Sequence, residues 1–332
     1  MDKRKRIAIT MGDPAGIGPE VTLKALMSKQ VGEVCLPVVI GDRVVLEAAA
    51  EELSIGYQLN EGTNFIEVSA IAGRDFPRNE PSAVGGRASV AYIRKAVELA
   101  LKGEVDAVVT APITKEALKI AGFTWPGHTE MLAELTGTAD YAMMLSGGPL
   151  RIILATIHTA LKDVPVLITQ ARVLKTIRFA DSACKMMGIT HPRIAVAGLN
   201  PHAGEAGLFG HEERDSIIPA VKAAAAEGIA VSGPYPADTL FYKAYKGEFD
   251  IVVCMYHDQG LIPLKMIAFD SGVNVTVGLP IIRTSPDHGT AYDIAWQGKA
   301  DPASMIEAIK LATVLRASNK MTRSINQIRN GM

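Results

Sequence analysis

Short runs of apolar and β-branched residues recur along the chain and predict its strands. Most runs are continuously apolar, which is typical of strands buried on both faces of a sheet. The predicted strands cover residues 6–11, 36–41, 106–111, 150–157, 193–198, 250–255 and 273–278. Helical spacing of apolar residues predicts helices over 19–29, 43–52, 86–102, 115–121, 129–136, 170–187, 212–226 and 302–317. Strands that alternate with helices predict an α/β protein with mainly parallel sheets.

The length of 332 residues predicts two domains, because a domain usually has roughly 100 to 200 residues. Turns rich in glycine and proline near residues 123–127 and 278–280 are the best candidate positions at which the chain passes from one domain to the other. We therefore expect a discontinuous first domain, residues 1–125 plus 280–332, and a second domain over residues 126–279.

Composition and charge narrow the classes of partner. The 34 Lys+Arg and 35 Asp+Glu residues give a formal net charge of -1, which leaves no global field for nucleic acid or an anionic membrane. No apolar run approaches the ~18 residues of a membrane span, and the run over 7–11 is too short for a signal peptide. The three cysteines are far apart and lack CxxC spacing. We expect no disulfide, no thiolate zinc site and a reducing cytoplasm.

A glycine-rich turn joins the first predicted strand to the first predicted helix. Gly12, Gly16 and Gly18 would let backbone N–H groups approach an anion at the start of the helix. Val21 replaces the last glycine of a GxGxxG fingerprint, and no P-loop GK[ST] follows. A tight strand-to-helix turn explains this segment about as well as a cofactor site does.

Three of the seven histidines follow predicted strands directly: His158, His202 and His257. In an open α/β sheet, ligands bind outside the carboxyl ends of the strands, so loops there could bring these imidazoles together. Each alone is more simply a hydrogen-bonded histidine, but the three together favour a catalytic divalent metal. His211 begins a segment similar to HExxH, yet Asp215 replaces its second histidine, so no zincin site is expected.

A further group of polar residues offers anion binding. Cationic side chains near strand ends and a threonine at a helix start are typical groups that hold phosphate or carboxylate. The group consists of His128, Thr129, Lys265, Asn274 and Arg283. Each alone is equally well a solvated charge or a helix cap, so a joint role requires that they share one cleft.

The loop after the last predicted strand offers a nucleotide contact. Its polar residues include His288, Gly289, Thr290 and Asp293. The loop could wrap an adenosine, and Asp293 could accept hydrogen bonds from ribose hydroxyls, which would favour NAD over NADP. The alternative is an ordinary loop that leads into the helix beginning near Pro302.

Five segments of the chain resemble the 4-hydroxythreonine-4-phosphate dehydrogenase family of vitamin B6 biosynthesis. They are GDPAGIGPE (12–20), GHTE (127–130), NPHAGE (200–205), MYHDQG (255–260) and IRTSPDHGTA (282–291). The resemblance implies the fold of isocitrate and isopropylmalate dehydrogenases, with two α/β/α domains and a cleft between them. It also implies NAD as the cofactor and a homodimer with a shared active site.

The resemblance further implies roles for individual residues. His158, His202 and His257 would bind one divalent ion (zinc, magnesium or cobalt) with ligands shared between subunits. His128, Thr129, Lys265, Asn274 and Arg283 would bind the phosphorylated four-carbon substrate. Lys265, Asp238 and Asp258 are candidates for charge stabilisation and proton transfer during oxidation and decarboxylation, although either aspartate is equally well a helix cap or a surface charge.

Trp296 leaves the substrate open. It stands where the wider dehydrogenase fold usually has the glycine of DIAG, and a DIAW segment also resembles the branch that acts on D-threonate or D-erythronate 4-phosphate. Two other hypotheses are a metal-dependent binding protein for a phosphorylated metabolite and a phosphotransferase. The missing P-loop lysine disfavours the phosphotransferase.

Overall fold

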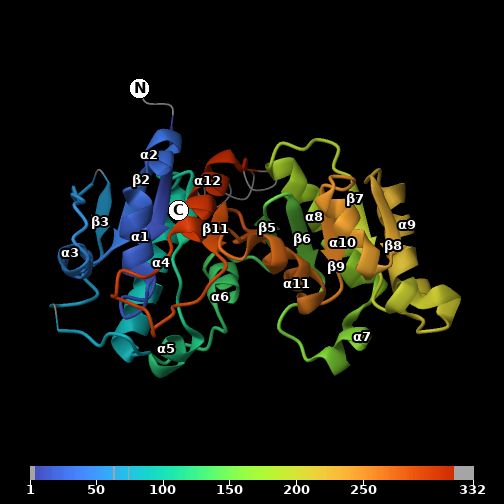
Figure 1. The fold of residues 1–332 in the computed structure, drawn as a ribbon, viewed down its shortest axis with the longest axis horizontal. Helices are drawn as coiled ribbons and strands as arrows, with labels where there is room; N and C mark the ends of the chain where they lie inside the picture. Colours follow the sequence, from blue (N-terminus) through green and yellow to red (C-terminus); the bar gives the residue numbers. More distant parts are fainter. Residues whose placement is uncertain (1–3, 63, 74, 318–332) are drawn as a thin grey trace. The chain divides into compact units, whose positions relative to one another are not determined.

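The computed structural model describes residues 4–62, 64–73 and 75–317, and the chain divides into two compact units (Figure 1). Unit 1 is formed by the described residues up to Asp140 and from Leu279 onward. Unit 2 is continuous and covers Tyr141–Gly278.

Within the described residues, the strands of unit 1 form a parallel sheet in the order β3-β2-β1-β4-β11. Their bounds are β1 Lys5–Thr10, β2 Cys35–Gly41, β3 Phe65–Glu67, β4 Ala107–Thr110 and β11 Arg283–Pro286. Ile7 of β1 pairs with Pro37 on one side and Ala107 on the other. Residues 7–10 of this central strand are fully buried, as the apolar residues 7–9 predict for a strand covered on both faces.

The helices of unit 1 pack on this sheet in two groups. Their bounds are α1 Gly18–Leu26, α2 Lys29–Val34, α3 Arg43–Glu52, α4 Ala83–Lys102, α5 Lys115–Ile120, α6 His128–Leu135 and α12 Ala303–Val314. Helix α4 contacts β1, β2 and β4 together with α5 and α6, whereas α12 contacts β11, β4 and β1 together with α1 and α2. Ser82 caps α4 by accepting from the Gly85 N–H at 3.0 Å, which satisfies a donor that the helix leaves unpaired.

Unit 2 contains a mixed sheet in the order β10-β5-β6-β9-β7-β8. Its strands are β5 Ala142–Gly147, β6 Leu150–Leu154, β7 Ile194–Ala197, β8 Val231–Tyr235, β9 Ile251–Cys254 and β10 Val273–Val277. Pairing is antiparallel from β10 through β5 to β6 and parallel from β6 through β9 and β7 to β8. The α-helices are α7 Val164–Leu167, α8 Gln170–Met186, α9 Ile218–Ala226, α10 Ala237–Tyr245 and α11 His257–Ala268.

All seven predicted strands are present, and the α/β prediction is confirmed. The pattern missed β3, β5, β8 and β11. Strand β11 lacks an apolar run, yet Arg283 and Thr284 in it are buried because Thr110 and the Ala308 carbonyl accept their hydrogen bonds. The prediction of mainly parallel sheets holds for three of the five strand pairings described in unit 2. The other two are antiparallel, since the tight turn at Gly148 (φ 54°) reverses the chain between β5 and β6, and β10 pairs antiparallel with β5.

The prediction of a loop after His257 is also wrong, since His257 begins α11. Gln259 bonds the Met255 N–H at 2.6 Å and the Gly198 carbonyl at 2.7 Å. Gly260 packs so closely on β6 and β9 that a Cβ would lie 2.7 Å from the Ile152 side chain. These contacts hold the first turn of the helix against the sheet.

The first crossing between the units lies after Asp140, later than the predicted position 125. The cause is α6, which packs against α4. The second crossing, between Gly278 and Leu279, lies within one residue of the predicted position.

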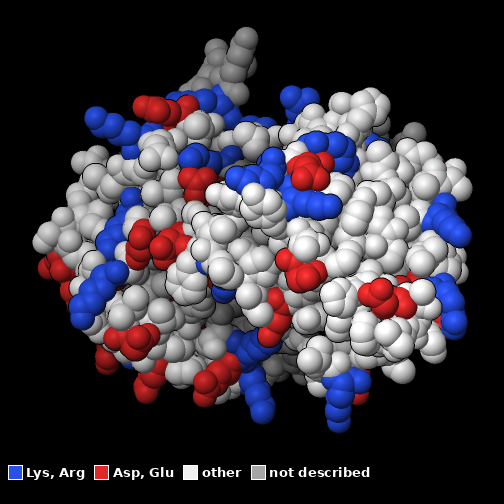
Figure 2. Space-filling model, turned by 45° about the vertical axis from the view of Figure 1, so that its right-hand side comes forward, with Lys and Arg blue, Asp and Glu red and all other residues white. Residues whose placement is uncertain are grey.

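Figure 2 shows acidic and basic side chains interspersed on the visible face. No helix in the described ranges has the length and apolar character that a bilayer crossing needs. Cys35, Cys184 and Cys254 are free thiols, and all of them are buried.

Candidate active site

Arg283 begins β11 and is 2% exposed. Its Nε and Nη2 atoms donate to the Thr110 hydroxyl at 3.1 and 2.6 Å, so the end of β4 holds the guanidinium. Burial lowers the pKa of Arg283 to about 9, and the Glu130 carboxylate raises it only in part. A buried guanidinium whose positive charge is only partly compensated within the protein is stabilised by an anionic ligand.

His128 and Thr129 open α6 in the same unit. Burial and, secondarily, the positive charge of Arg283 hold the pKa of His128 well below its ordinary value, so its imidazole is neutral at pH 7. Its Nε2 atom is buried and has no hydrogen-bond partner among the residues that the structure describes. Buried polar atoms are normally paired. This unpaired nitrogen is therefore a candidate contact for a bound ligand. Three of the five predicted anion-binding residues thus belong to unit 1, and Arg283 interacts electrostatically with His128.

Lys265 and Asn274 belong to unit 2. Asn274 lies on β10, and its buried Oδ1 atom has no hydrogen-bond partner in the described residues. Lys265 lies on α11, with its Nζ atom 5.8 Å from the centre of the Phe269 ring. The unpaired amide oxygen of Asn274 is the second orphaned polar atom among the predicted substrate residues.

His158 and His257 are brought together in unit 2, with ring centroids 5.8 Å apart. They follow β6 and β9, which are parallel neighbours, so both imidazoles emerge at the same edge of the sheet. Both line a cavity of about 300 Å³ together with Tyr256 and Asp258. His257 Nδ1 lies 2.7 Å from Asp258 Oδ1, a contact that leaves Nε2 to face a metal.

His202 is not part of this pair. It is exposed on the segment Pro201–Gly207, where residues 202–206 have positive φ angles. The buried Glu213 carboxylate holds the start of this segment by accepting the Leu199 and Asn200 N–H groups, each at 2.7 Å. Within the ranges that the structure describes, no group of three or more His, Cys, Asp and Glu side chains could hold a metal. Two of the predicted metal ligands are therefore adjacent in one chain, and the third is elsewhere.

The glycine-rich turn after β1 packs closely against neighbouring backbone groups of unit 1. A Cβ on Gly12 would lie 2.4 Å from the Pro112 carbonyl, and one on Gly18 would lie 2.2 Å from the Met11 carbonyl, so close backbone approach requires glycine at both positions. Gly16 similarly lies against Thr290. The N–H of Gly16 bonds the Asp13 carbonyl at 3.1 Å. The glycines thus have a packing role, and their contact with a cofactor stays a prediction.

Asp13 connects this turn to the loop over residues 288–296. Its carboxylate is fully buried, with Oδ1 accepting the Ala15 N–H at 2.9 Å and Oδ2 accepting the Tyr292 hydroxyl at 2.8 Å. Burial raises the pKa of Asp13, while these two hydrogen bonds act in the opposite direction. The connection was not predicted, although both residues lie in segments that the motifs marked.

Two further contacts fix the same loop. The Ile17 N–H donates to the Thr290 carbonyl at 2.9 Å, and Trp296 Nε1 donates to the Pro14 carbonyl at 3.1 Å. The Arg78 guanidinium lies 4.0 Å from the centre of the Trp296 ring. Trp296, which departs from the DIAG pattern, is therefore a buried structural element of unit 1.

The predicted cofactor residues of this loop differ in exposure. Thr290 is buried, whereas Gly289 and Asp293 are exposed. His288 has a buried Nε2 atom without a hydrogen-bond partner in the described chain. The exposed Asp293 carboxylate and the orphaned His288 nitrogen are available to a ligand.

The two candidate aspartates have different surroundings. The Asp258 side chain is 71% exposed and touches His257, so it orients a predicted metal ligand. Asp238 is exposed in the first turn of α10.

Residues 33–312 match the family model described as "Pyridoxal phosphate biosynthetic protein PdxA". The chain belongs to this family. A relative from Desulforapulum autotrophicum, named 4-hydroxythreonine-4-phosphate dehydrogenase, is 48% identical over 97% of this chain and 99% of the relative. Another from Salmonella typhimurium, named D-threonate 4-phosphate dehydrogenase, is 48% identical over 94% of this chain and 99% of the relative. The resemblance inferred from the five segments is confirmed, and the chain is related over nearly its whole length to proteins named as dehydrogenases.

Solved structures agree with the assignment to the PdxA family. A crystal structure of a 4-hydroxythreonine-4-phosphate dehydrogenase from Burkholderia phymatum matches with a TM-score of 0.84 and 45% identity, covering 96% of this chain and 100% of that one. A β-decarboxylating dehydrogenase from Thermococcus kodakarensis matches with a TM-score of 0.50 and 17% identity, covering 98% and 89%. The second likeness concerns the fold alone, and it agrees with the predicted isocitrate dehydrogenase-like architecture.

Proposed function

We propose that this chain is an NAD-dependent, metal-dependent dehydrogenase that oxidises and decarboxylates 4-phosphohydroxy-L-threonine. The observation that carries the proposal is the nearly full-length identity of 48% with a relative named for that activity. NAD would accept the hydride from C3, and loss of the C1 carboxylate would then give 3-amino-2-oxopropyl phosphate.

Burial and charge support a phosphate site at Arg283 and α6. The Arg283 guanidinium supplies a buried positive charge and the Thr129 hydroxyl supplies a further hydrogen bond to the phosphate, while the unpaired Nε2 of the neutral His128 would accept a hydrogen bond from the substrate. Charge-assisted hydrogen bonds to phosphate oxygens are among the stronger ones in proteins. We assign Asn274 and Lys265 to the remaining polar groups of the substrate.

The imidazole pair supports a metal site. Two adjacent histidines, one of them oriented by a carboxylate, fit zinc or cobalt better than magnesium, because magnesium prefers oxygen ligands. His158 and His257 of one chain would hold the ion, and His202 of a second copy would complete the set. When bound, such an ion supplies Lewis-acid polarisation of the substrate hydroxyl.

The surface of α11 supports a homodimer. Ile262 and Met266 on this helix and Phe269 at its C-cap are 60%, 82% and 74% exposed, at the i, i+4, i+7 spacing of one face. An exposed apolar helix face of this kind marks an interface. Because α11 begins with His257, a second copy on this face would lie close to the imidazole pair and could supply its missing ligand.

The loop over residues 288–293 supports NAD binding by unit 1. Asp293 would accept hydrogen bonds from the ribose hydroxyls and repel the 2′-phosphate of NADP. Gly16 would contribute by packing against Thr290, and Gly12 and Gly18 by allowing the close backbone approach that shapes the turn. Unit 1 would then be the cofactor domain, and unit 2 would carry the metal and the dimer surface.

Residues of unit 2 would stabilise the charge that develops in the reaction and transfer protons. The Lys265 ammonium would stabilise the negative charge that develops on the C3 oxygen as carbon dioxide leaves. Asp258 would keep the His257 imidazole in one orientation, and Asp238 is a candidate proton carrier. We further propose a cytoplasmic location, which suits the three free thiols.

A second candidate substrate is D-threonate or D-erythronate 4-phosphate. The Salmonella typhimurium relative named for the D-threonate compound is also 48% identical, and Trp296 matches the DIAW pattern of that branch. Both substrates offer a 3-hydroxy acid with a 4-phosphate, so the same residues would serve either one.

The deciding experiment follows NADH formation by the metal-loaded protein with each phosphorylated acid in separate cells. We expect turnover of 4-phosphohydroxy-L-threonine. Turnover of a sugar-acid phosphate alone would replace our substrate assignment with the second candidate. Metal and substrate binding without NADH from any of the three would contradict the dehydrogenase proposal and favour a phosphometabolite-binding protein.

A further inference from the structure

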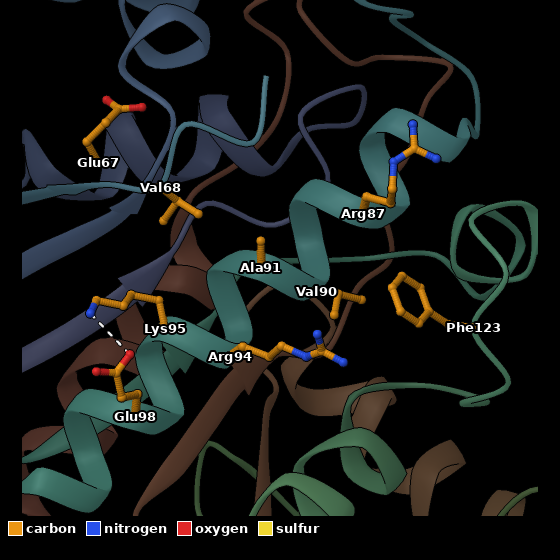
Figure 3. Close-up of a pocket in the computed structure, with 9 residues that line it drawn as sticks. All are labelled: Glu67, Val68, Arg87, Val90, Ala91, Arg94, Lys95, Glu98 and Phe123. Carbon is orange, nitrogen blue, oxygen red and sulfur yellow. Dashed lines mark hydrogen bonds and ion pairs between the residues drawn. The ribbon is translucent and has the colours of Figure 1, made fainter. Parts of the chain in front are cut away.

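A groove in unit 1 lies outside all the residues assigned above. It has a volume of about 560 Å³ and is bordered by one face of α4, by Glu67 and Val68 at the end of β3, and by Phe123 after α5. Figure 3 shows the lining side chains along α4. Cavities of ~300–1,000 Å³ are the usual size for small-molecule sites.

The floor of the groove is set by spacing along α4. Arg87, Ala91 and Arg94 stand at i, i+4 and i+7, so they share one face of the helix. At 1.5 Å per residue, the two arginines begin about 10 Å apart along the axis. The small Ala91 side chain between them leaves open space above the helix.

The carboxylates that line the groove are already engaged. Glu98 accepts from Lys95 at 3.1 Å and, through its other oxygen, from Lys102 at 2.6 Å. Glu67 accepts the Arg43 and Ser69 N–H groups at 3.0 and 3.1 Å. Neither acid is paired with Arg87 or Arg94.

The two arginines leave their donors available. In the part of the chain that the structure describes, the Arg87 side chain has no hydrogen bond or ion pair, and the Arg94 guanidinium lies 5.9 Å from the centre of the Trp125 ring. Figure 3 shows Arg94 extending toward Phe123, whereas Lys95 extends the other way toward Glu98. A cation held over a ring keeps its N–H groups free for an anion.

Phe123 forms an aromatic wall on this side of the groove, and Trp125 stacks on it without lining the groove itself. Phe123 and Trp125 are stacked, with ring centroids 5.2 Å apart and an interplanar angle of 16°. Trp125 is anchored because its Nε1 donates to Glu134 Oε2 at 2.7 Å. The wall is thus a fixed, flat apolar surface next to a cation.

We infer that this groove binds a small anion that carries a planar aromatic ring. Arg87 and Arg94 hold the phosphate or carboxylate group, and the ring packs against Phe123. The preference for a ring follows from the aromatic wall, and the preference for an anion follows from the two arginines. The inference is independent of the proposed dehydrogenase activity.

The test measures the dissociation constant of phenyl phosphate for the full-length protein by calorimetry. Arg87→Ala/Arg94→Ala should raise it about 100-fold, roughly tenfold for each lost charge-assisted contact. Ala91→Phe should raise it at least about tenfold by filling the groove without changing its charge. Lys222→Ala, which removes an exposed cation from α9, is the matched control and should leave binding unchanged.

Further binding measurements distinguish the contributions of the anionic group, the ring and the proposed active site. Inorganic phosphate should bind more weakly than phenyl phosphate because it lacks the ring, and benzoate tests whether carboxylate replaces phosphate. Arg283→Lys should leave phenyl phosphate binding unchanged, since Arg283 does not line the groove. Binding that survives the double arginine substitution, that is lost in Arg283→Lys, or that is absent from the wild-type protein at millimolar ligand would overturn the inference. Thermal unfolding of each variant confirms that it is folded.

Discussion

The Tyr292 hydroxyl donates a 2.8 Å hydrogen bond to Asp13, whose carboxylate is fully buried. The two residues are 279 positions apart in the chain. This bond joins the glycine-rich turn after β1 to the loop that we assign to NAD. The loop is thus positioned by a buried acid as well as by its own sequence.

Asp13 should make stability depend on pH. Burial raises its pKa above the ordinary value of 3.8, so at pH values between the unfolded and the native pKa the native protein retains a proton that the unfolded chain has lost. The stability from this protonation is fully present below the unfolded pKa and is lost as the pH rises through the native pKa. Asp13→Asn removes this titration. The free energy of unfolding of the variant should therefore rise relative to that of the wild type as the pH increases. Urea unfolding of both proteins from about pH 4 to pH 8 measures the difference, and a difference that is constant with pH would contradict the prediction.

Arg283→Ala should reduce kcat/KM for the phosphorylated substrate about 10- to 100-fold, the value of one or two charge-assisted hydrogen bonds. The unphosphorylated analogue should be affected far less, because it makes no contact with the guanidinium. Steady-state kinetics with both compounds measures this, with the exposed Arg214→Ala as a control. Arg283→Lys guards against misfolding, since it keeps a buried cation. An equal loss of kcat/KM with both compounds would contradict a role of Arg283 in phosphate binding.

The shared metal site predicts complementation between inactive chains. His202→Ala and His257→Ala should each lose bound metal and turnover, whereas the exposed His191→Ala should lose neither. Co-expression of the two inactive chains should restore about a quarter of the wild-type turnover, because half of the random dimers are mixed and each has one intact site. If all three histidines acted within one chain, co-expression would restore nothing. Elemental analysis and NADH formation measure the two effects.

Asp293→Ser should relax the preference for NAD. The exposed carboxylate would repel the 2′-phosphate of NADP, so its removal should raise the ratio of kcat/KM for NADP to that for NAD about tenfold. Asp301→Ser, at another exposed acid beyond this loop, is the control. An unchanged ratio would place cofactor selection on other residues.

The hydrophobic pattern predicted the fold wherever burial coincided with apolar sequence. Strand β9 and residues 7–9 of β1 are apolar, and both strands were found, whereas β11 reads RTSP. It is buried because distant partners, Thr110 and the Ala308 carbonyl, satisfy its polar groups. Helix α11 was missed because its first turn depends on Gln259 reaching the Gly198 carbonyl. Such long-range pairing leaves no periodic signal in the sequence.

The candidate site was predictable in residue type but less so in arrangement. Strand ends marked His158 and His257, and parallel pairing of β6 with β9 brings them together. The same reasoning placed His202 with them, yet the turn held by Glu213 keeps it apart within one chain. A ligand from a second copy is beyond the reach of spacing arguments. The burial of Arg283, on which its proposed phosphate role depends, likewise results from packing that no local pattern shows.

The buried cysteines have a practical consequence for work on this protein. Burial raises the pKa of Cys35 to about 11 and that of Cys184 to about 12, and it also raises the pKa of Cys254. Alkylating reagents act on thiolates, so these three side chains will be inert in the folded state at neutral pH. A cysteine introduced at an exposed position such as Lys222 can therefore be labelled selectively in the native sequence background. Fluorescent or spin probes placed in this way would report distances and motions in solution without first removing the natural thiols.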